Sequence, residues 1–569
     1  MKINIIKIIG LVFLGLISTG CLEDAFQKGG SVTSDRLDEM DDATVLEAII
    51  KGIPASMMSA NAGGYAGSYG YHADFGISAI HLMTEHMLED MTIGGNLGYS
   101  WFNGFLTNLS MGPEYVTTGY IWQCYYVWIG AANNAIGMVG EVTDETDDAV
   151  RNYLGQAYTY RAMCYLDLAR LYEPKANRYL NADEEALAEG WSVPIVTEAT
   201  SDEDKKNNPR RSREEMYDFI LSDLQMAEDL LDPTVNVYSL PTLGAVYGLY
   251  ARAYIEMAAA SNEKKYYRMA AEYADLAVKT SGRTPLTESQ WHDSMNGFNN
   301  GSSNNSWIWG LTSSSENLAP VISTVAHLSA EAIWAYGILA LPSISKATYE
   351  RISDNDFRKW SWLGEDATTW KTDPNYRYAG SDEPLTGNES YGIYNVADYF
   401  LYSAKPYVSL KFRPMGGACM DYTNGGAADR MLMRVEEMYF IKMEATLHTE
   451  GLDAAKKLLD EFMSYRWSGQ RYDCSGIISK ESFIQEMLFQ KRVEFWGEGI
   501  LFYDYKRLDQ GIIRGYSGTN FPSSARFNVE GRSPQWNLVI PRTEYLHNKG
   551  IDEGRINPDP TGKLPEWTE

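Results

Sequence analysis

One stretch of the sequence reads Arg492-Val493-Glu494-Phe495-Trp496-Gly497-Glu498-Gly499-Ile500-Leu501-Phe502-Tyr503-Asp504-Tyr505-Lys506-Arg507 and mixes acidic, basic and aromatic residues at close spacing. Glu494 and Glu498 are four residues apart, so they share one face of a helix. Two carboxylates on one face can act as an acid and a base, but carboxylates beside cations keep low pKa values and make poor general acids. We therefore expect a buried or half-buried ion network that ties a helix to the loop after it. The neighbouring cations are Lys491, Arg492, Lys506 and Arg507.

Helical periodicity extends from this stretch toward the N-terminus. In the segment 147–173, for example, Ala157, Cys164 and Leu168 share one face, and Pro174 follows the helix end. Pairs of such helices bury their faces by stacking on neighbouring pairs. We therefore expect a mainly α fold built from tetratricopeptide-like helix pairs. The predicted helices are 41–53, 73–92, 115–139, 147–173, 212–232, 240–260, 264–280, 427–449, 451–468 and 480–497.

The chain changes character between two helical parts. From 281 to about 426, Gly, Ser, Asn and Trp dominate and helical periodicity fades. We expect a large irregular, loop-rich region over 281–426, preceded by an N-terminal helical part at 41–280 and followed by a C-terminal helical part at 427–569. A further predicted loop, 93–113, carries Trp101 among glycines.

The first residues have the pattern of an export signal. A basic start is followed by an apolar run, 8–17, which is too short to span a bilayer. Small residues then lead to Cys21, an arrangement that resembles the lipobox of bacterial lipoproteins, in which the cysteine is lipidated. We expect a signal peptide at 1–20 and a lipidated tether at 21–40; the alternative is a plain secretory signal with a chance cysteine. The next residues, Leu22-Glu23-Asp24, resemble the acidic export tag of surface lipoproteins.

Charge and composition narrow the class of protein. The formal charge is −27, from 49 Lys+Arg against 76 Asp+Glu. This balance argues against a nucleic-acid-binding protein, which needs basic side chains to neutralise phosphates, and against electrostatic docking on anionic lipid. The 39 Tyr and 15 Trp combine an apolar face with a polar edge and point to recognition surfaces.

Four segments, in order, resemble the SusD/RagB family of outer-membrane nutrient-binding lipoproteins. The fourth, Arg492–Arg507, is the most specific and is similar to the family pattern R-x-x-E-F-x-x-E-G-x-R-F-x-D-x-x-R. The chain departs from the family at Ile500, where members commonly carry Arg or His, and near the end, where it reads Ile556-Asn557-Pro558 and members commonly close on Gln-Asn-Pro-Gly. The other three segments are Asp74-Phe75-Gly76 with Asp90-Met91, Arg161–Leu168 and Arg434–Ala445.

The resemblance implies a SusD-like fold with four tetratricopeptide-like helix pairs and an irregular ligand-binding region. It implies a lipid-anchored protein on the surface of the outer membrane that captures a glycan. Such proteins sit as a lid on a SusC-like TonB-dependent barrel and deliver the glycan to it; they are not enzymes and need no cofactor. Two alternatives are a surface glycoside hydrolase whose Glu494 and Glu498 flank the scissile bond, and a lid or adhesin with no glycan affinity.

Aromatic rings in loops are the expected ligand-binding residues, because an indole or phenol ring stacks on the apolar face of a sugar ring. In the family, the ligand platform comes from loops in the same early and central stretches of the chain. The alternative for each ring is packing on its own scaffold, which we expect for Trp122, Trp128 and Trp496 on helical patterns. The expected glycan-binding residues are Trp101, Trp307, Trp309, Trp334 and Tyr336.

Neither a catalytic nor a metal site is expected. His81 and His86 are five residues apart, whereas the HExxH ligands of a zinc protease are four apart on one helical face. The cysteines of the mature chain form no CxxC motif, and Cys124 and Cys164 lie in apolar helical patterns, where a buried free thiol is expected. No basic cluster is present that would select an acidic polysaccharide.

Overall fold

The computed structural model describes residues 42–59, 72–93, 100–186, 190–293, 298–302, 304–313, 322–332, 340–365, 405–418, 421–469 and 471–568. Cys21, Trp334 and Tyr336 lie outside the described residues, as do the predicted signal peptide and tether. None of the helices within those ranges is long and apolar enough to cross a membrane.

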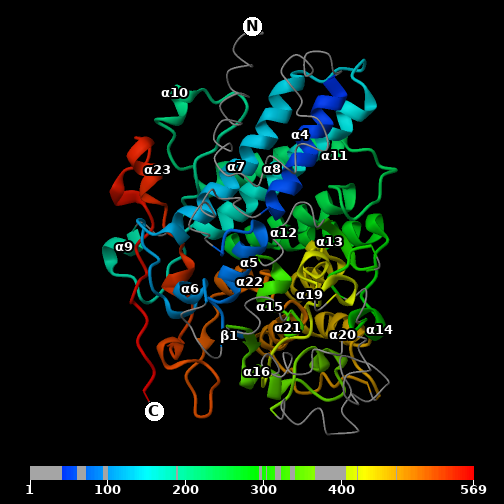
Figure 1. Ribbon diagram of the computed structural model, residues 1–569, viewed down its shortest axis with the longest axis vertical. Coiled ribbons are helices and arrows are strands. Elements are labelled where there is room, and N and C mark those ends of the chain that lie inside the picture. Colours follow the sequence, from blue (N-terminus) through cyan, green and yellow to red (C-terminus); the bar gives the residue numbers. More distant parts are fainter. Residues whose placement is uncertain are drawn as a thin grey trace.

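Long helices of the N-terminal part pack on one another in sequence order. They are α4 (Asp42–Met58), α7 (Val116–Val139), α8 (Asp148–Tyr172), α11 (Arg213–Leu230), α12 (Leu243–Ser261) and α13 (Lys264–Ser281). Each helix packs on the next, from α4 on α7 through to α12 on α13. Figure 1 shows the series descending from the top of the molecule, where α4, α7, α8 and α11 lie, to α12 and α13 in the middle. The predicted helices 41–53, 115–139, 147–173, 212–232, 240–260 and 264–280 are confirmed, with bounds that differ by a few residues.

Local sequence explains where these helices begin and end. The Ser212 side chain accepts a hydrogen bond from the N–H of Glu215, whose carboxylate accepts one from the N–H of Ser212, and this capping box starts α11. Asp147 caps α8 by accepting from the N–H of Ala149. Gly282 follows α13 with a φ of 62°, a left-handed conformation that ends the helix.

The helical series continues in the C-terminal part, far along the sequence. Its helices are α19 (Val435–Thr449), α20 (Leu452–Met463), α21 (Lys480–Glu494) and α22 (Leu501–Arg507). α13 packs on α19, which packs on α20 and α21. The predicted helix 427–449 is wrong at its start, because residues 430–434 form a strand and α19 begins only at Val435. The predicted helix 480–497 ends at Glu494, before Gly497 and Gly499, whose φ angles are 77° and 78°.

The strands are short, and among the described residues they form three sheets of two strands each. β1 (Met91–Ile93) pairs with β3 (Pro342–Ile344), β2 (Trp307–Leu311) with β4 (Arg430–Arg434), and β5 (Ile512–Ile513) with β6 (Asn528–Val529), all antiparallel. The predicted helix 73–92 is shorter than expected: α5 spans Ile77–Glu85, and the chain then turns into β1. The strands tie the irregular region to the helical parts, because β3 and β2 each pair with a strand outside it.

The remaining elements are short helices that cover the ends and sides of the long ones. The α-helices among them are α6 (Asn103–Thr107), α9 (Ala182–Ala186), α10 (Asp202–Lys205), α14 (Glu288–Trp291), α15 (Thr324–Leu328), α16 (Lys346–Arg351), α18 (Tyr422–Gly425) and α23 (Arg542–His547). The 3-10 helices are η3 (Phe357–Ser361), η5 (Met415–Gly417), η6 (Ser523–Ala525), η7 (Pro534–Trp536) and η8 (Glu553–Arg555).

Large aromatic side chains and thiols fill the core. Trp122, Trp128 and Trp496 are buried, as their helical patterns predicted. Cys124 and Cys164 are buried free thiols, which confirms the expectation for both. These side chains belong to one hydrophobic cluster that runs through the helical series.

Candidate functional site

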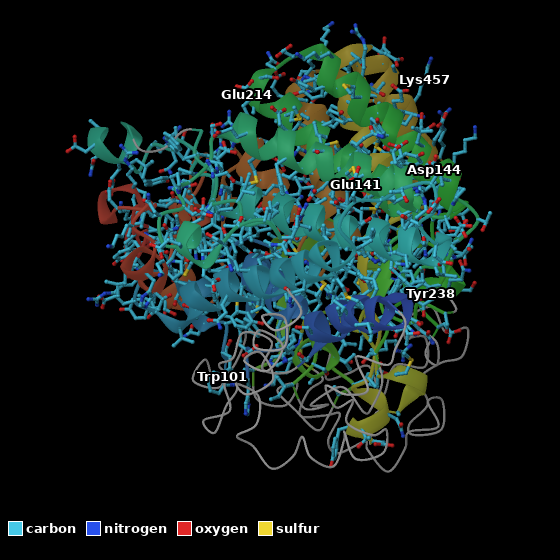
Figure 2. All side chains as sticks on the ribbon, turned by 90° about the horizontal axis from the view of Figure 1, so that it is seen from above. Trp101, Glu141, Asp144, Glu214, Tyr238 and Lys457 are labelled. Atoms are coloured by element: carbon cyan, nitrogen blue, oxygen red, sulfur yellow. The ribbon has the colours of Figure 1, made fainter. Side chains whose placement is uncertain are left out.

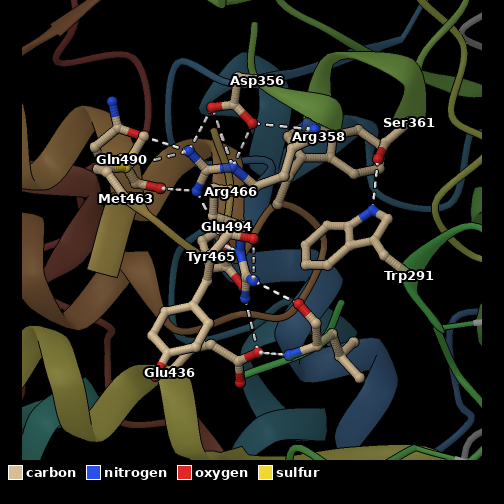
Figure 3. Close-up of polar contacts among 12 residues, drawn as sticks. Trp291, Asp356, Arg358, Ser361, Glu436, Met463, Tyr465, Arg466, Gln490 and Glu494 are labelled. Atoms are coloured by element: carbon tan, nitrogen blue, oxygen red, sulfur yellow. Dashed lines mark hydrogen bonds and ion pairs between the residues drawn. The ribbon is translucent and has the colours of Figure 1, made fainter. Parts of the chain in front are cut away.

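The carboxylate of Glu494 lies at the end of α21 among three guanidinium groups. Arg466 donates from Nε at 2.8 Å, and Arg434 and Arg358 each donate from Nη1 at 3.0 Å. All four side chains are fully buried. Burial alone would raise the pKa of Glu494, but the charges of Arg466 and Arg434 hold it well below its usual range. Figure 3 shows the guanidinium of Arg466 bridging Glu494 and Glu436, with Asp356 paired to Arg358 above it.

Glu498 is paired as completely as Glu494. Lys411 donates from Nζ to Glu498 at 2.7 Å and to the backbone oxygens of Glu494 and Trp496 at 2.7 and 2.9 Å. Arg434 donates from Nε to Glu498 at 3.0 Å. Burial lowers the pKa of Lys411 to about 8, against the charge of Glu498.

The predicted ion network is confirmed, and its geometry decides what these carboxylates do. The two carboxylates connect α21, β4 and the segments around Arg358 and Arg466. The low pKa of Glu494 makes it a poor general acid, and both carboxylates are taken up by buried cations. Glu494 and Glu498 therefore hold the helices and loops of the C-terminal part together.

Trp307 and Trp309 were expected as exposed loop rings, and that prediction is wrong. Both lie on β2 and are fully buried. The strand forms because β4 supplies an antiparallel partner, with Trp307 opposite Arg434. The ring of Trp309 packs 5.3 Å from that of Tyr160, and the ring of Trp307 packs 5.8 Å from that of Tyr238. Neither indole presents a face to a ligand.

Trp101 is half-buried, just before α6, and it is the predicted ligand residue that the structure leaves at the surface. Figure 2 places it at the edge of the molecule opposite Glu214 and Lys457. The centroid of its ring lies 5.2 Å from that of His72, at an interplanar angle of 44°. Trp334 and Tyr336 lie outside the described residues, so the structure does not bring them together with Trp101.

A small pocket opens beside Trp101. It encloses about 210 Å³ of space, part of it open to solvent. Trp101, Phe102, His86 and His327 supply aromatic walls, and Ser100 supplies a hydroxyl. The rest of the lining is apolar and comes from Ile93, Ala340 and Pro342.

Histidine and phenylalanine rings stack behind the pocket. The ring of His86 stacks on that of Phe102 at 5.6 Å, and the ring of His327 stacks on that of Phe75 at 4.8 Å. The ring of His327 also meets the ring of Phe102 edge-on at 5.4 Å. These residues come from the end of α5, the start of α6 and α15, so three separate segments converge here.

Both pocket histidines are neutral. Burial, helped by the charge of Arg514 and by His327, lowers the pKa of His86 to about 3. Burial lowers the pKa of His327 to about 4, although its Nδ1 lies 2.9 Å from the carbonyl oxygen of Ser323. Within the described part of the chain, neither ring nitrogen of His86 has a hydrogen-bond partner.

Sequence reasoning missed His86 and His327 as pocket residues. The sequence suggests His86 only as a metal ligand together with His81, and the structure places the two rings in different surroundings. Nδ1 of His81 lies 3.0 Å from Nη2 of Arg430, whereas His86 lines the pocket. The described residues contain no group of three or more His, Cys, Asp or Glu side chains placed to hold a metal ion.

The chain is similar to two family models that together cover most of it. The model described as "Starch-binding associating with outer membrane" matches residues 73–255, and the model of the SusD family matches residues 286–544. SusD-like protein P2 of Formosa agariphila is 23% identical over 493 residues, which are 82% of this chain and 86% of that protein. SusD-like protein P38 of the same organism is 22% identical over 421 residues, 72% of this chain and 75% of that protein.

Solved structures share the fold. A SusD-like carbohydrate-binding protein from Bacteroides vulgatus superposes with a TM-score of 0.66 at 20% identity, over 90% of this chain and 98% of that chain. Surface glycan-binding protein A from Bacteroides thetaiotaomicron, in complex with laminarihexaose, superposes with a TM-score of 0.60 at 16% identity, over 89% of this chain and 98% of that chain. These superpositions confirm the fold class predicted from the sequence.

Proposed function

Because the chain belongs to the SusD/RagB family, we propose that it captures a glycan at the cell surface and passes it to a SusC-like TonB-dependent barrel. The observation that carries the proposal is the pocket at Trp101, where a half-buried indole stands beside a neutral, mostly apolar depression. An aromatic face with a few polar groups is the usual construction of a sugar site. The laminarihexaose bound to the structurally similar surface glycan-binding protein A supports the same ligand class.

Trp334 and Tyr336 are proposed to complete the site with Trp101. In the sequence, these two aromatic residues lie between His327 and Ala340, which both line the pocket. In this proposal the irregular region 281–426 supplies one side of the ligand site and the segment around Trp101 the other.

The anchor and the partner follow from the N-terminal sequence and the family. We propose that Cys21 is lipidated, that residues 21–40 form the tether, and that the protein sits on the outer face of the outer membrane. In this proposal the protein is the lid of the barrel, and it binds the glycan and releases it into the barrel. It does not cleave the glycan, because Glu494 and Glu498 are taken up in a buried ion network.

Affinity electrophoresis of residues 22–569 through gels cast with a panel of polysaccharides tests the proposal. Each lane is also assayed for newly released reducing ends. Retardation without product supports glycan capture. Product release contradicts the assignment as a binding protein, and retardation by no polysaccharide contradicts glycan binding by this chain and favours a lid without its own affinity. Co-purification of the full-length protein with a barrel from outer membranes tests the partner separately.

A further inference from the structure

We infer that the pocket beside Trp101 receives one hydroxyl-bearing substituent of a neutral hexose, the exocyclic hydroxymethyl group, and that His86 hydrogen-bonds to it. This inference rests on the proposed function and names the class of sugar that the site selects. It follows from three observations: His86 has no hydrogen-bond partner among the described residues, the pocket is small, and its described walls are uncharged.

His86 is a polar residue of the pocket wall whose ring has no hydrogen-bond partner among the described residues. Its side chain is fully buried, it lines the pocket, and both ring nitrogens lack partners within the described residues. Buried polar groups are nearly always hydrogen-bonded, so an unpaired imidazole at a pocket wall calls for a ligand. A neutral imidazole offers one donor and one acceptor, which match the two roles of a hydroxyl group.

The size of the pocket selects a substituent, not a whole ring. The enclosed part has room for a group about the size of one water molecule. The indole of Trp101 stands at the surface beside it. A sugar ring stacked on Trp101 therefore directs a single exocyclic group inward, past Phe102 and toward His86.

The walls select against charge. The described lining residues are aromatic, apolar or hydroxylated, and its two imidazoles are neutral near pH 7. A carboxylate buried there would face no counter-charge, which is strongly unfavourable. A pentose in the pyranose form, such as xylose, lacks the hydroxymethyl group and would leave His86 unpaired, and sites built to bond a hydroxyl discriminate strongly against analogues without it.

Affinity gels test the sugar class. The panel holds neutral hexose polymers (β-glucan, galactan, galactomannan), a pentose polymer whose rings lack the hydroxymethyl group (unsubstituted xylan) and uronate polymers (polygalacturonate, alginate). We expect retardation by at least one hexose polymer and by no pentose or uronate polymer. Retardation by a pentose or uronate polymer as strong as that by any hexose polymer overturns the inference and leaves the proposed function standing. Retardation by none overturns the proposed function and, with it, the inference.

Substitution of His86 tests the pocket itself, with the retained hexose polymer as the probe. His86→Phe keeps an aromatic ring on Phe102 and removes both nitrogens, so we expect an affinity loss of about tenfold or more. The melting temperature should stay the same or rise, because an unpaired buried polar group is removed. His86→Gln restores a donor and an acceptor and should bind within about threefold of the wild type.

A matched control separates a pocket role from a structural one. His448 stacks on Tyr267 at 4.1 Å, on α19 and outside the pocket, so His448→Phe makes the same chemical change elsewhere. We expect its affinity to equal that of the wild type. Wild-type affinity in a folded His86→Phe variant overturns the inference, as does an equal loss of affinity in both variants.

Discussion

Glu494 and His86 are both fully buried, yet the protein treats them in opposite ways. Glu494 is ionised and shared by three guanidinium groups, whereas His86 is neutral and its ring nitrogens have no partner among the described residues. A buried charge that is completely paired stabilises the fold, because removal of one partner leaves the remaining charges buried without compensation. A buried polar group left open at a pocket points to a ligand. For Glu494 and His86, the pairing of the buried group separates a scaffold residue from a candidate site residue.

The largest expected effect is on the scaffold side of this comparison. Glu494→Ala leaves Arg358, Arg434 and Arg466 buried without their shared acceptor. We expect the free energy of unfolding to fall by about 3–5 kcal/mol, at the upper end of that range. Urea denaturation followed by circular dichroism measures it. A Glu494→Ala protein of wild-type stability would show that the network is not structural and would reopen the hydrolase alternative.

Trp309→Ala tests whether the buried tryptophans belong with the scaffold. The ring is fully buried against Tyr160, so its removal leaves a cavity in the core. We expect a loss of about 3–4 kcal/mol in the free energy of unfolding. Glycan affinity per folded molecule should not change, as measured by affinity electrophoresis below the unfolding temperature. A specific loss of affinity with unchanged stability would place Trp309 in the ligand site after all.

Trp101→Ala tests the site side. Truncating a half-buried indole that stacks on the ligand should weaken binding by about 2 kcal/mol, or roughly thirtyfold in Kd. Trp191→Ala is the matched control, because Trp191 is 44% exposed, lies outside the pocket lining and pairs with Ser212 just before α11. We expect the control to bind as the wild type does. Equal losses in both variants would mean that exposed indoles contribute without a defined site.

Glu85 tests the same comparison through the pH dependence of stability. It sits on α5, one residue before His86, and its carboxylate accepts from the N–H of Gly499 at 2.8 Å. Burial, opposed by that hydrogen bond and reinforced by the charge of Asp90, raises the pKa of Glu85 from 4.5 to about 8. The folded protein therefore keeps a proton that the unfolded chain releases above about 4.5, and stability falls as the pH rises toward 8.

Glu85→Gln should remove this part of the pH dependence while its amide oxygen still accepts from Gly499. We expect the slope of unfolding free energy against pH to flatten by up to about 1.4 kcal/mol per pH unit between pH 5 and 8. Thermal or urea unfolding at several pH values measures the slope. An unchanged slope would mean that Glu85 is ionised in the folded protein. The rule that an incompletely paired buried group stays neutral would then fail at Glu85.

The helical series was predictable because its signals are local. Apolar spacing predicted α7, α8, α11, α12 and α13 to within a few residues. The mixture of charges around Glu494 predicted an ion network correctly, although its partners Arg358 and Arg466 lie on other segments. Local patterns identify elements and charged clusters but not the distant residues that complete them.

The candidate site was only partly predictable because it depends on distant segments. Trp307 and Trp309 follow a run of Asn and Ser and resemble a loop, but β4, far along the sequence, turns them into a buried strand. A short run of aromatic and β-branched residues bounded by Gly, Asn and Ser is typical of a strand. This pattern could have predicted β2 from the sequence. His86 and His327 meet only because α5 and α15 converge, which no pattern in either segment indicates.

A crystal structure of residues 22–569 with an oligosaccharide of the retained polymer tests the central claim most directly. The pocket account predicts a sugar ring stacked on the indole of Trp101, with one exocyclic hydroxyl within hydrogen-bond distance of a ring nitrogen of His86. An oligosaccharide bound on another face, with the surface beside Trp101 vacant, would contradict it.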